Sequence, residues 1–117
     1  MTILKMYEKI NLVTKLEQRR FFNYYEDTIN ELRALYGDKY LFTKDTDYVP
    51  PESLSDTSVL LPLYEDAVID NILYKAKAGG EGNDVYKTEF IRKSQEAYLE
   101  YWHSGIKGRR IRKIWGW

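Results

Sequence analysis

Hydrophobic side chains recur at every third or fourth position in three separate stretches of this chain, a spacing that places them on one face of a helix. The clearest series consists of Phe22, Tyr25, Ile29, Leu32 and Tyr36. Before it, Thr14-Lys15-Leu16-Glu17 is typical of a capping box, in which the threonine and glutamate side chains satisfy backbone N–H groups of the first turn. We predict a helix from residue 14 to 36 that ends at Gly37, where a left-handed backbone stops it.

The second half of the chain predicts two more helices. Pro62 suits the first position of a helix, and Gly79-Gly80 would end it. Its apolar row is Tyr64, Val68, Ile72 and Ala76, with Ile69 and Leu73 beside it. Asn83 or Asp84 can cap the last helix, which would end at Gly105. Its two stripes are Tyr86, Phe90, Ala97 and Tyr101, and next to them Ile91, Tyr98 and Trp102.

A short amphipathic segment at residues 3–12 completes the set, with Ile3, Met6, Tyr7 and Ile10 on one face. With 117 residues the chain has the length of one domain, and without cysteines it has neither disulfides nor thiolate metal sites. We therefore predict an all-α fold: a small antiparallel helical bundle of three main helices plus a short N-terminal one over residues 1–106, followed by an extended C-terminal tail, residues 107–117.

Residues 38–61 form a long central loop in this prediction. Tyr40-Leu41-Phe42 and Tyr48-Val49 flank a polar stretch and favour a short hairpin, while Pro50-Pro51 excludes a helix. A loop of this length in a small domain is often a binding loop. The side chains that we expect at an interface between subunits are Tyr40, Phe42, Tyr48, Leu54 and Leu60.

Charge is distributed unevenly along the chain, although its net charge is zero. The tail contains five basic residues and no acidic one, which leaves 13 positive against 18 negative charges in residues 1–106. Such a tail is suited to an acidic partner. The partner-binding residues that we expect in it are Arg109, Arg110, Ile111, Arg112, Lys113, Ile114, Trp115 and Trp117.

Three interpretations of this tail remain open. Its cations can bind phosphates while its tryptophans stack on bases, as in nucleic-acid-binding segments. Its isoleucines and tryptophans can instead anchor in the pockets of a partner protein while the arginines pair with acids. The tail can also fold back on its own acidic body.

The sequence offers little for catalysis or for metal binding. The single histidine, His103, lies next to Trp102 and Ser104 near the end of a predicted helix, which favours a solvent-facing or helix-dipole role. Glu96 and Glu100 share a helix face but lack the histidine of a carboxylate metal motif. We expect no catalytic residues, no metal ligands and no cofactor. No stretch is long and apolar enough for a membrane span or a signal peptide, so we expect a cytoplasmic protein or part of a particle assembled in the cytoplasm.

One sequence pattern extends over nearly the whole chain. Leu61-Pro62-Leu63-Tyr64-Glu65-Asp66-Ala67 opens one predicted helix, and Lys87-Thr88-Glu89-Phe90 and Ala97-Tyr98 lie in the next. Together with Phe22-Asn23-Tyr24-Tyr25 in the first long helix, this order resembles head–tail connector (adaptor) subunits of tailed phages.

The resemblance implies a non-enzymatic subunit of the virion neck, assembled in the host cytoplasm. Such subunits form a ring, usually of twelve copies, on the portal protein. They extend the DNA channel without sequence-specific contact and present a surface to the next neck or tail-completion protein. The clasping parts of this chain would be the loop 40–60 and the tail 107–117. A regulator that binds nucleic acid through the basic tail is the alternative, although no helix-turn-helix recognition helix is evident.

Overall fold

The computed structural model describes residues 1–43, 48–78, 80 and 82–106 of the chain. Its four helices are α1 (Ile3–Asn11), α2 (Gln18–Tyr36), α3 (Pro62–Ala76) and α4 (Asn83–Ile106). The residues that the structure describes contain no strand, only two isolated backbone bridges. The predicted all-α fold with three main helices and a short N-terminal one is confirmed.

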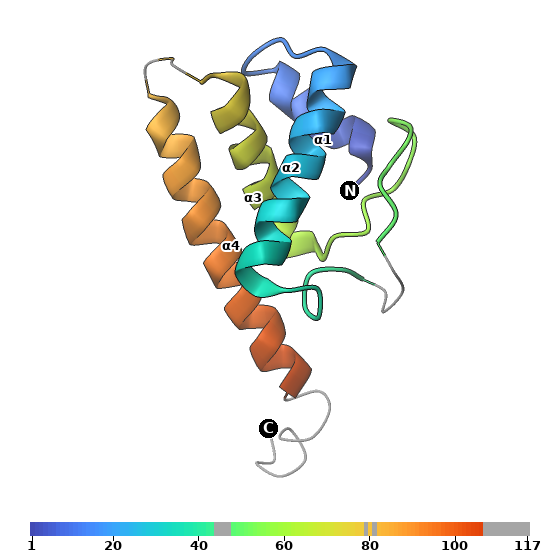
Figure 1. The fold of residues 1–117 in the computed structure, drawn as a ribbon, viewed down its shortest axis with the longest axis vertical. Helices are drawn as coiled ribbons and strands as arrows, with labels where there is room; N and C mark the ends of the chain where they lie inside the picture. Colours follow the sequence, from blue (N-terminus) through green and yellow to red (C-terminus); the bar gives the residue numbers. More distant parts are fainter. Residues whose placement is uncertain (44–47, 79, 81, 107–117) are drawn as a thin grey trace.

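The three long helices run in alternating directions, and α1 lies across one end of the bundle (Figure 1). Helix α3 packs against each of the other three helices, most extensively against α4. It buries eight of its 15 residues, including both rows of the predicted apolar face down to Leu73. Helix α3 is therefore the centre of the fold, and the other helices are placed by their contacts with it.

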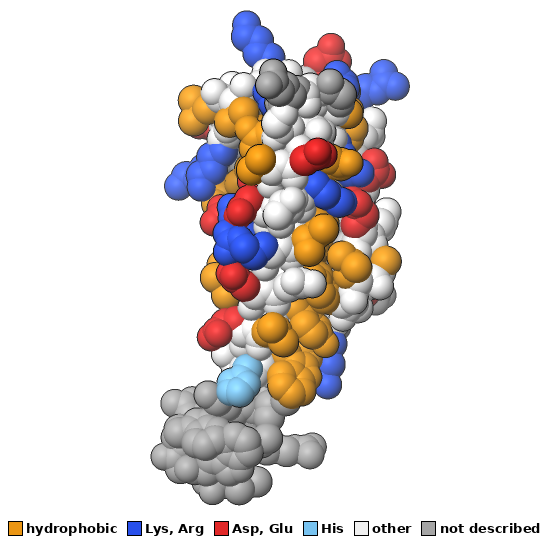
Figure 2. All heavy atoms as spheres, turned by 90° about the vertical axis from the view of Figure 1, so that its left-hand side faces the viewer, with side chains coloured by type: hydrophobic (Ala, Val, Ile, Leu, Met, Phe, Trp, Pro, Cys, Tyr) orange, Lys and Arg blue, Asp and Glu red, His pale blue; other side chains and the backbone are white. Residues whose placement is uncertain are grey.

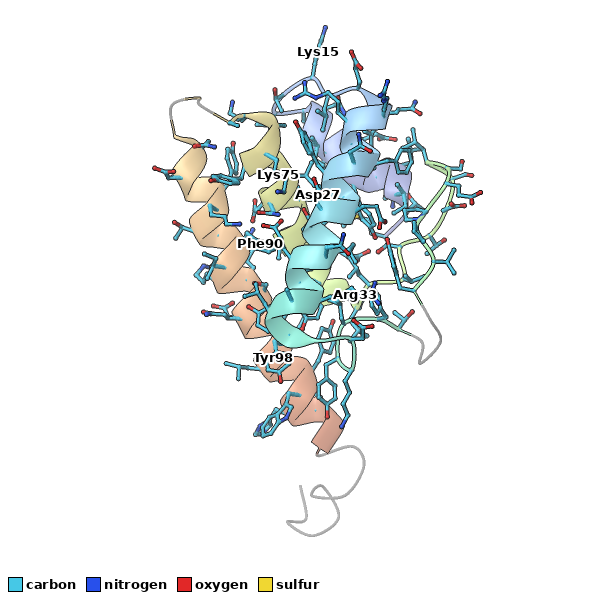
Figure 3. All side chains as sticks on the ribbon, in the orientation of Figure 1. Lys15, Asp27, Arg33, Lys75, Phe90 and Tyr98 are labelled. Atoms are coloured by element: carbon cyan, nitrogen blue, oxygen red, sulfur yellow. The ribbon has the colours of Figure 1, made fainter. Side chains whose placement is uncertain are left out.

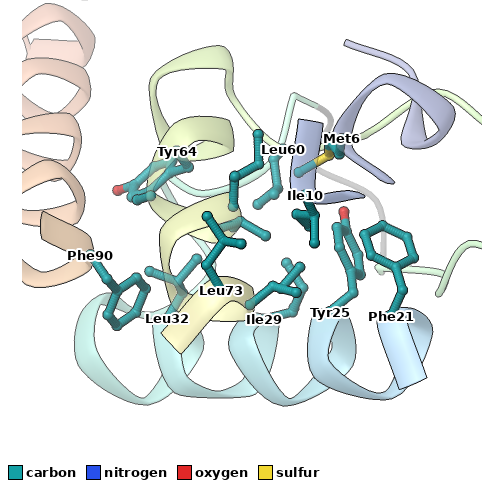
Figure 4. Packing of buried hydrophobic residues seen from close by; sticks show 14 of the residues in the cluster. Met6, Ile10, Phe21, Tyr25, Ile29, Leu32, Leu60, Tyr64, Leu73 and Phe90 are labelled. Carbon is teal, nitrogen blue, oxygen red and sulfur yellow. The ribbon is translucent and has the colours of Figure 1, made fainter. Parts of the chain in front are cut away.

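The core between α1, α2 and α3 consists of aliphatic side chains closed at one end by aromatic rings. Met6 and Ile10 from α1 approach Phe21 and Tyr25 of α2, and Leu73 of α3 lies beside Ile29 (Figure 4). Burial raises the pKa of Tyr25 to about 12. The buried aromatic residue at the start of the α2 stripe is Phe21, whereas the predicted Phe22 is only half-buried. The other buried members of the predicted stripe are Tyr25, Ile29 and Leu32.

The capping-box prediction at residues 14–17 is wrong. Helix α2 begins at Gln18, and Glu17 occupies the N-cap position without a side-chain hydrogen bond. The cause is Leu16, which is buried in the core. Its N–H donates to Asn11 Oδ1, and its carbonyl accepts a hydrogen bond from the Tyr7 hydroxyl. These bonds hold the backbone of Leu16 outside the helix.

Both ends of α3 can be explained by local chemistry. Pro62 lies in its first turn as predicted, where the missing N–H costs nothing. The helix ends at Ala76, three residues before the predicted Gly79-Gly80 stop. The Gly80 N–H donates to the Lys77 carbonyl at 2.8 Å, so a tight turn begins at Lys77, directly after the helix. At the end of α2, Gly37 has a φ of 74°, which explains why a glycine stops that helix.

The central loop is fixed by backbone hydrogen bonds. The N–H groups of Ile3 and Leu4 donate to the carbonyls of Asp56 and Leu54, and those of Thr43 and Leu61 donate to Val59 and Leu41. The predicted hairpin is not formed by its described residues, because Phe42 pairs with Leu60 rather than with Tyr48 or Val49. Its turn, residues 44–47, lies outside the described residues.

Candidate partner-binding surface

Helix α4 is the longest element and extends past the ends of α2 and α3 (Figure 1). A helix of 24 residues is about 36 Å long, more than a 15-residue partner can cover. The part of α4 that follows Tyr101 therefore has little of the bundle beside it. The eight tail residues that we expect to bind partners follow this end of α4 in sequence, and all of them lie outside the described residues.

The outward side of α4 carries large apolar side chains that the bundle leaves exposed. Leu99 is 62% exposed and Trp102 is 43% exposed, and Val85 and Ile91 are exposed as well. In Figure 2 hydrophobic side chains gather in the lower part of this face, close to the histidine. Ile91 and Trp102 of the predicted second stripe of α4 therefore lie at the surface. The third member, Tyr98, stacks on Tyr36 of α2, with 4.9 Å between the ring centroids. Clustered apolar exposure of this kind marks interaction surfaces.

The other edge of α4 is charged. Arg92 lies 2.5 Å from Glu89 and 3.0 Å from Glu96, and Lys93 Nζ lies 2.7 Å from Asp70 of α3. The guanidinium of Arg92 lowers the pKa of Glu89, which stays ionised in the pair. Acidic and basic side chains alternate along this edge in Figure 2. This edge of α4 is therefore already neutralised in large part by its own pairs.

A groove of about 560 Å³ lies between the start of α3 and the second half of α4. Its lining residues are Leu63, Asp66, Arg92, Lys93, Glu96, Ala97 and Glu100. Leu63 is 50% exposed, although its neighbour Tyr64 is fully buried. The backbone N–H of Leu63 donates to the Tyr101 hydroxyl at 2.8 Å, which fixes the start of α3 against α4. The volume is in the range of pockets that hold a ligand-sized group.

This groove was not among the sites predicted from the sequence. The signal that could have found it is the pair Leu63 and Asp66 next to the buried Tyr64 and Ala67. Leu63 and Asp66 are three positions apart, so they lie on the same side of the helix, and both are exposed. Leu63, an apolar residue at the start of α3, is therefore available to a partner.

The predicted interface loop is mostly turned onto its own domain. Leu60 is 2% exposed and belongs to the core, so it offers no surface to a partner. Tyr40, Phe42, Tyr48 and Leu54 are half-buried. The Phe42 and Tyr48 rings stack at 5.0 Å with Arg33 over both, and the Tyr48 hydroxyl donates to Glu26. Among the described residues of this loop, the large apolar side chain that is exposed is Val49, which is not among the predicted interface residues.

A polar cluster joins α2, α3 and α4 beside the core. Asn71, fully buried on α3, donates to Thr28 Oγ1 at 2.9 Å and to Glu31 Oε2 at 2.7 Å. Lys87 Nζ donates to Glu31 Oε1 at 3.2 Å and lies over the Phe90 ring. Figure 3 shows Lys75 and Phe90 on the two helices next to α2. Every member has a partner within the cluster, which indicates a role in fixing helix positions.

The described residues contain no group of three or more His, Asp or Glu side chains placed to hold a metal ion. His103 is exposed near the end of α4, with its ring 6.5 Å from that of Trp102. None of the described helices is long and apolar enough to cross a membrane.

Fold and surface together define the class: a small all-α protein with an exposed apolar face on its last helix. No protein-family model matches the chain, and comparison with curated proteins and with solved structures finds no match either.

Proposed function

We propose that this chain is a structural assembly protein, and more specifically a head–tail connector subunit of a tailed phage that forms a ring on the portal protein. The observation that carries the proposal is the apolar face of α4, with Leu99 and Trp102 exposed on a helix that extends past the bundle. Exposing these side chains costs free energy that a partner recovers by covering them, since each Å² of buried apolar surface contributes about 25 cal/mol.

The distribution of charge supports a head-to-tail assembly. Residues 1–106 carry 13 basic and 18 acidic side chains, while residues 107–117 carry five basic ones. A ring built from one repeated contact needs two unlike surfaces that fit each other on every subunit. The acidic body and the basic tail satisfy that requirement within one chain.

The residues that carry the resemblance to connector subunits divide in the structure into buried and exposed ones. In the segment 61–67, Pro62 opens α3 and Tyr64 and Ala67 are buried, so these positions serve folding. Leu63 and Asp66 of the same segment point into the α3–α4 groove and are exposed. Pro62, Tyr64 and Ala67 are positions that the resemblance fixes, whereas Leu63 and Asp66 are positions that it leaves variable, as suits contacts with different partners.

The test is to mix the purified protein with the portal oligomer encoded near its gene and to image the mixture by electron microscopy. We expect an added ring-shaped layer on the tail-facing end of the portal. The double variant Leu99→Ala, Trp102→Ala should weaken this binding by a few kcal/mol if these side chains are anchors. The control Leu12→Ala, Val13→Ala removes exposed side chains that follow α1 and lie outside α4, and it should leave binding intact. Bare portals at a high excess of the natural protein would refute the connector function.

The five basic residues of the tail favour a second candidate, a regulator that binds nucleic acid. Neutralising five phosphates would give a slope of about −4 to −5 in log K against log salt on duplex DNA. The acidic side chains Glu89, Glu96 and Glu100 on α4 would repel a phosphate backbone, which is why we rank this function second. Absence of binding at low salt would eliminate it.

A further inference from the structure

We propose that the groove between α3 and α4 receives the basic C-terminal segment, residues 107–117, of a second copy of this chain. This inference rests on the proposed assembly function and names the contact that would link neighbouring subunits. The groove residues that the argument uses are Leu63, Asp66, Ala97 and Glu100.

The groove holds uncompensated negative charge. Its two basic side chains are already engaged, because Lys93 pairs with Asp70 and Arg92 pairs with Glu89 and Glu96. Asp66 and Glu100 are exposed and form no ion pair with any residue that the structure describes. A cation that enters the groove therefore gains the attraction of two carboxylates without displacing an existing pair.

The groove also holds apolar surface next to that charge. Leu63 is half exposed at its side, and Ala97 is buried in its lining with only a methyl group, which leaves room above it. The segment 110–115 has the sequence Arg-Ile-Arg-Lys-Ile-Trp, in which cations and bulky apolar residues are interspersed. A peptide of that composition can place Ile111 or Ile114 on Leu63 while Arg110 and Arg112 meet Asp66 and Glu100.

The direction of α4 favours a second copy as the source of the segment. The helix ends at Ile106, past the ends of α2 and α3, and the groove lies back along the same helix at residues 92–100 (Figure 1). The chain's own tail would have to reverse direction to reach it. The tail of a neighbour can enter without such a turn, and repeating the contact from copy to copy gives a head-to-tail assembly, which is a ring when the rotation between copies closes.

Disulfide trapping distinguishes the tail of a second copy from the chain's own tail, because the chain contains no cysteine that would interfere. The Leu63→Cys and Ile114→Cys variants, one of them enlarged by a tag, are mixed and oxidised. We expect a disulfide-linked heterodimer at rising protein concentration, and little linkage when Leu12→Cys replaces Leu63→Cys. A chain carrying both Leu63→Cys and Ile114→Cys that links only within itself would refute the second copy, and no linkage to position 63 at all would refute the groove.

Charge reversal tests the same contact without oxidation. Asp66→Lys with Glu100→Lys should weaken self-association, measured by sedimentation, at least tenfold, and Arg110→Glu with Arg112→Glu in the tail should restore it. The matched control reverses Glu8 and Asp27, two exposed acids outside the groove and outside every ion pair among the described residues. Undiminished self-association after groove reversal would refute the groove and leave the assembly function intact. A natural chain that binds neither itself nor the portal would refute both.

Discussion

Helices α3 and α4 pack against each other along much of their length, yet they differ sharply in what they bury. Helix α3 buries eight of its 15 residues, whereas in α4, among residues 83–104, only Phe90, Ser94 and Ala97 are buried. Both helices have two adjoining apolar stripes in the sequence. In α3 both stripes are covered, because other helices pack on several of its sides. In α4 one stripe meets the bundle and much of the other remains at the surface.

This difference assigns the two helices to different tasks. Apolar residues of α3 stabilise the fold, so substitutions there should lower the free energy of unfolding. Exposed apolar residues of α4 make few contacts within the chain, so substitutions there should leave stability nearly unchanged and affect only partner binding. Experiments can therefore separate the contribution of α3 to stability from that of α4 to partner binding.

The largest effect is expected from Ile72→Ala on α3. Ile72 is fully buried, so removing three carbons leaves a cavity and should lower the free energy of unfolding by about 2–5 kcal/mol. Leu99→Ala on α4 is the matched control, and its cost should remain within about 0.5 kcal/mol. Urea unfolding followed by far-ultraviolet circular dichroism measures both. Equal costs for the two variants would contradict the division between the helices.

A second, smaller effect is expected from Asn71→Ala, also on α3. The Asn71 side chain donates to Thr28 and Glu31 and accepts from Lys87. Its loss leaves polar groups without partners beside the core, which should cost about 1–3 kcal/mol. Gln95→Ala removes an exposed amide from α4 and should be nearly neutral. The same urea measurement applies, and a neutral Asn71→Ala would show that the polar cluster does not fix the helices.

The fold class and most of the buried face of α3 could be predicted from the sequence, because periodic hydrophobicity and the proline at its start act locally. Tyr64, Val68, Ile72 and Leu73 are buried as predicted. The buried polar residues Glu65 and Asn71 were not predicted, because each depends on a partner distant in sequence. Glu65 lies 3.2 Å from the Met1 ammonium, and Asn71 depends on Thr28 and Glu31.

Periodicity could not decide which stripe of α4 is covered, since it records apolar residues and not what packs on them. Ile91 and Trp102 fit a helix face as well as Phe90 does, but only Phe90 is buried. The prediction of where α2 starts was wrong for a related reason. A capping box is a local signal, and the burial of Leu16 together with its bonds to Asn11 and Tyr7 outweighs it. The α3–α4 groove needs both helices in place, and the exposed pair Leu63 and Asp66 marks only its α3 side.

The smallest effect, and one that depends on pH, is expected at Glu31 on α2, which links to both helices. Burial alone would raise its pKa, but hydrogen bonds from Asn71 and Lys87 and the charge of Lys75 lower it below the ordinary value of 4.5. The folded pKa is therefore below the unfolded one, so Glu31 contributes stability above pH 4.5 that is lost as the pH falls through the folded pKa. Because the side chain is partly exposed, this contribution should be no more than about 1 kcal/mol. Glu31→Gln should flatten the dependence of unfolding free energy on pH below 4.5. An unchanged pH profile in Glu31→Gln would mean that Lys87 and Lys75 hold α4 and α3 to α2 without an ionised partner.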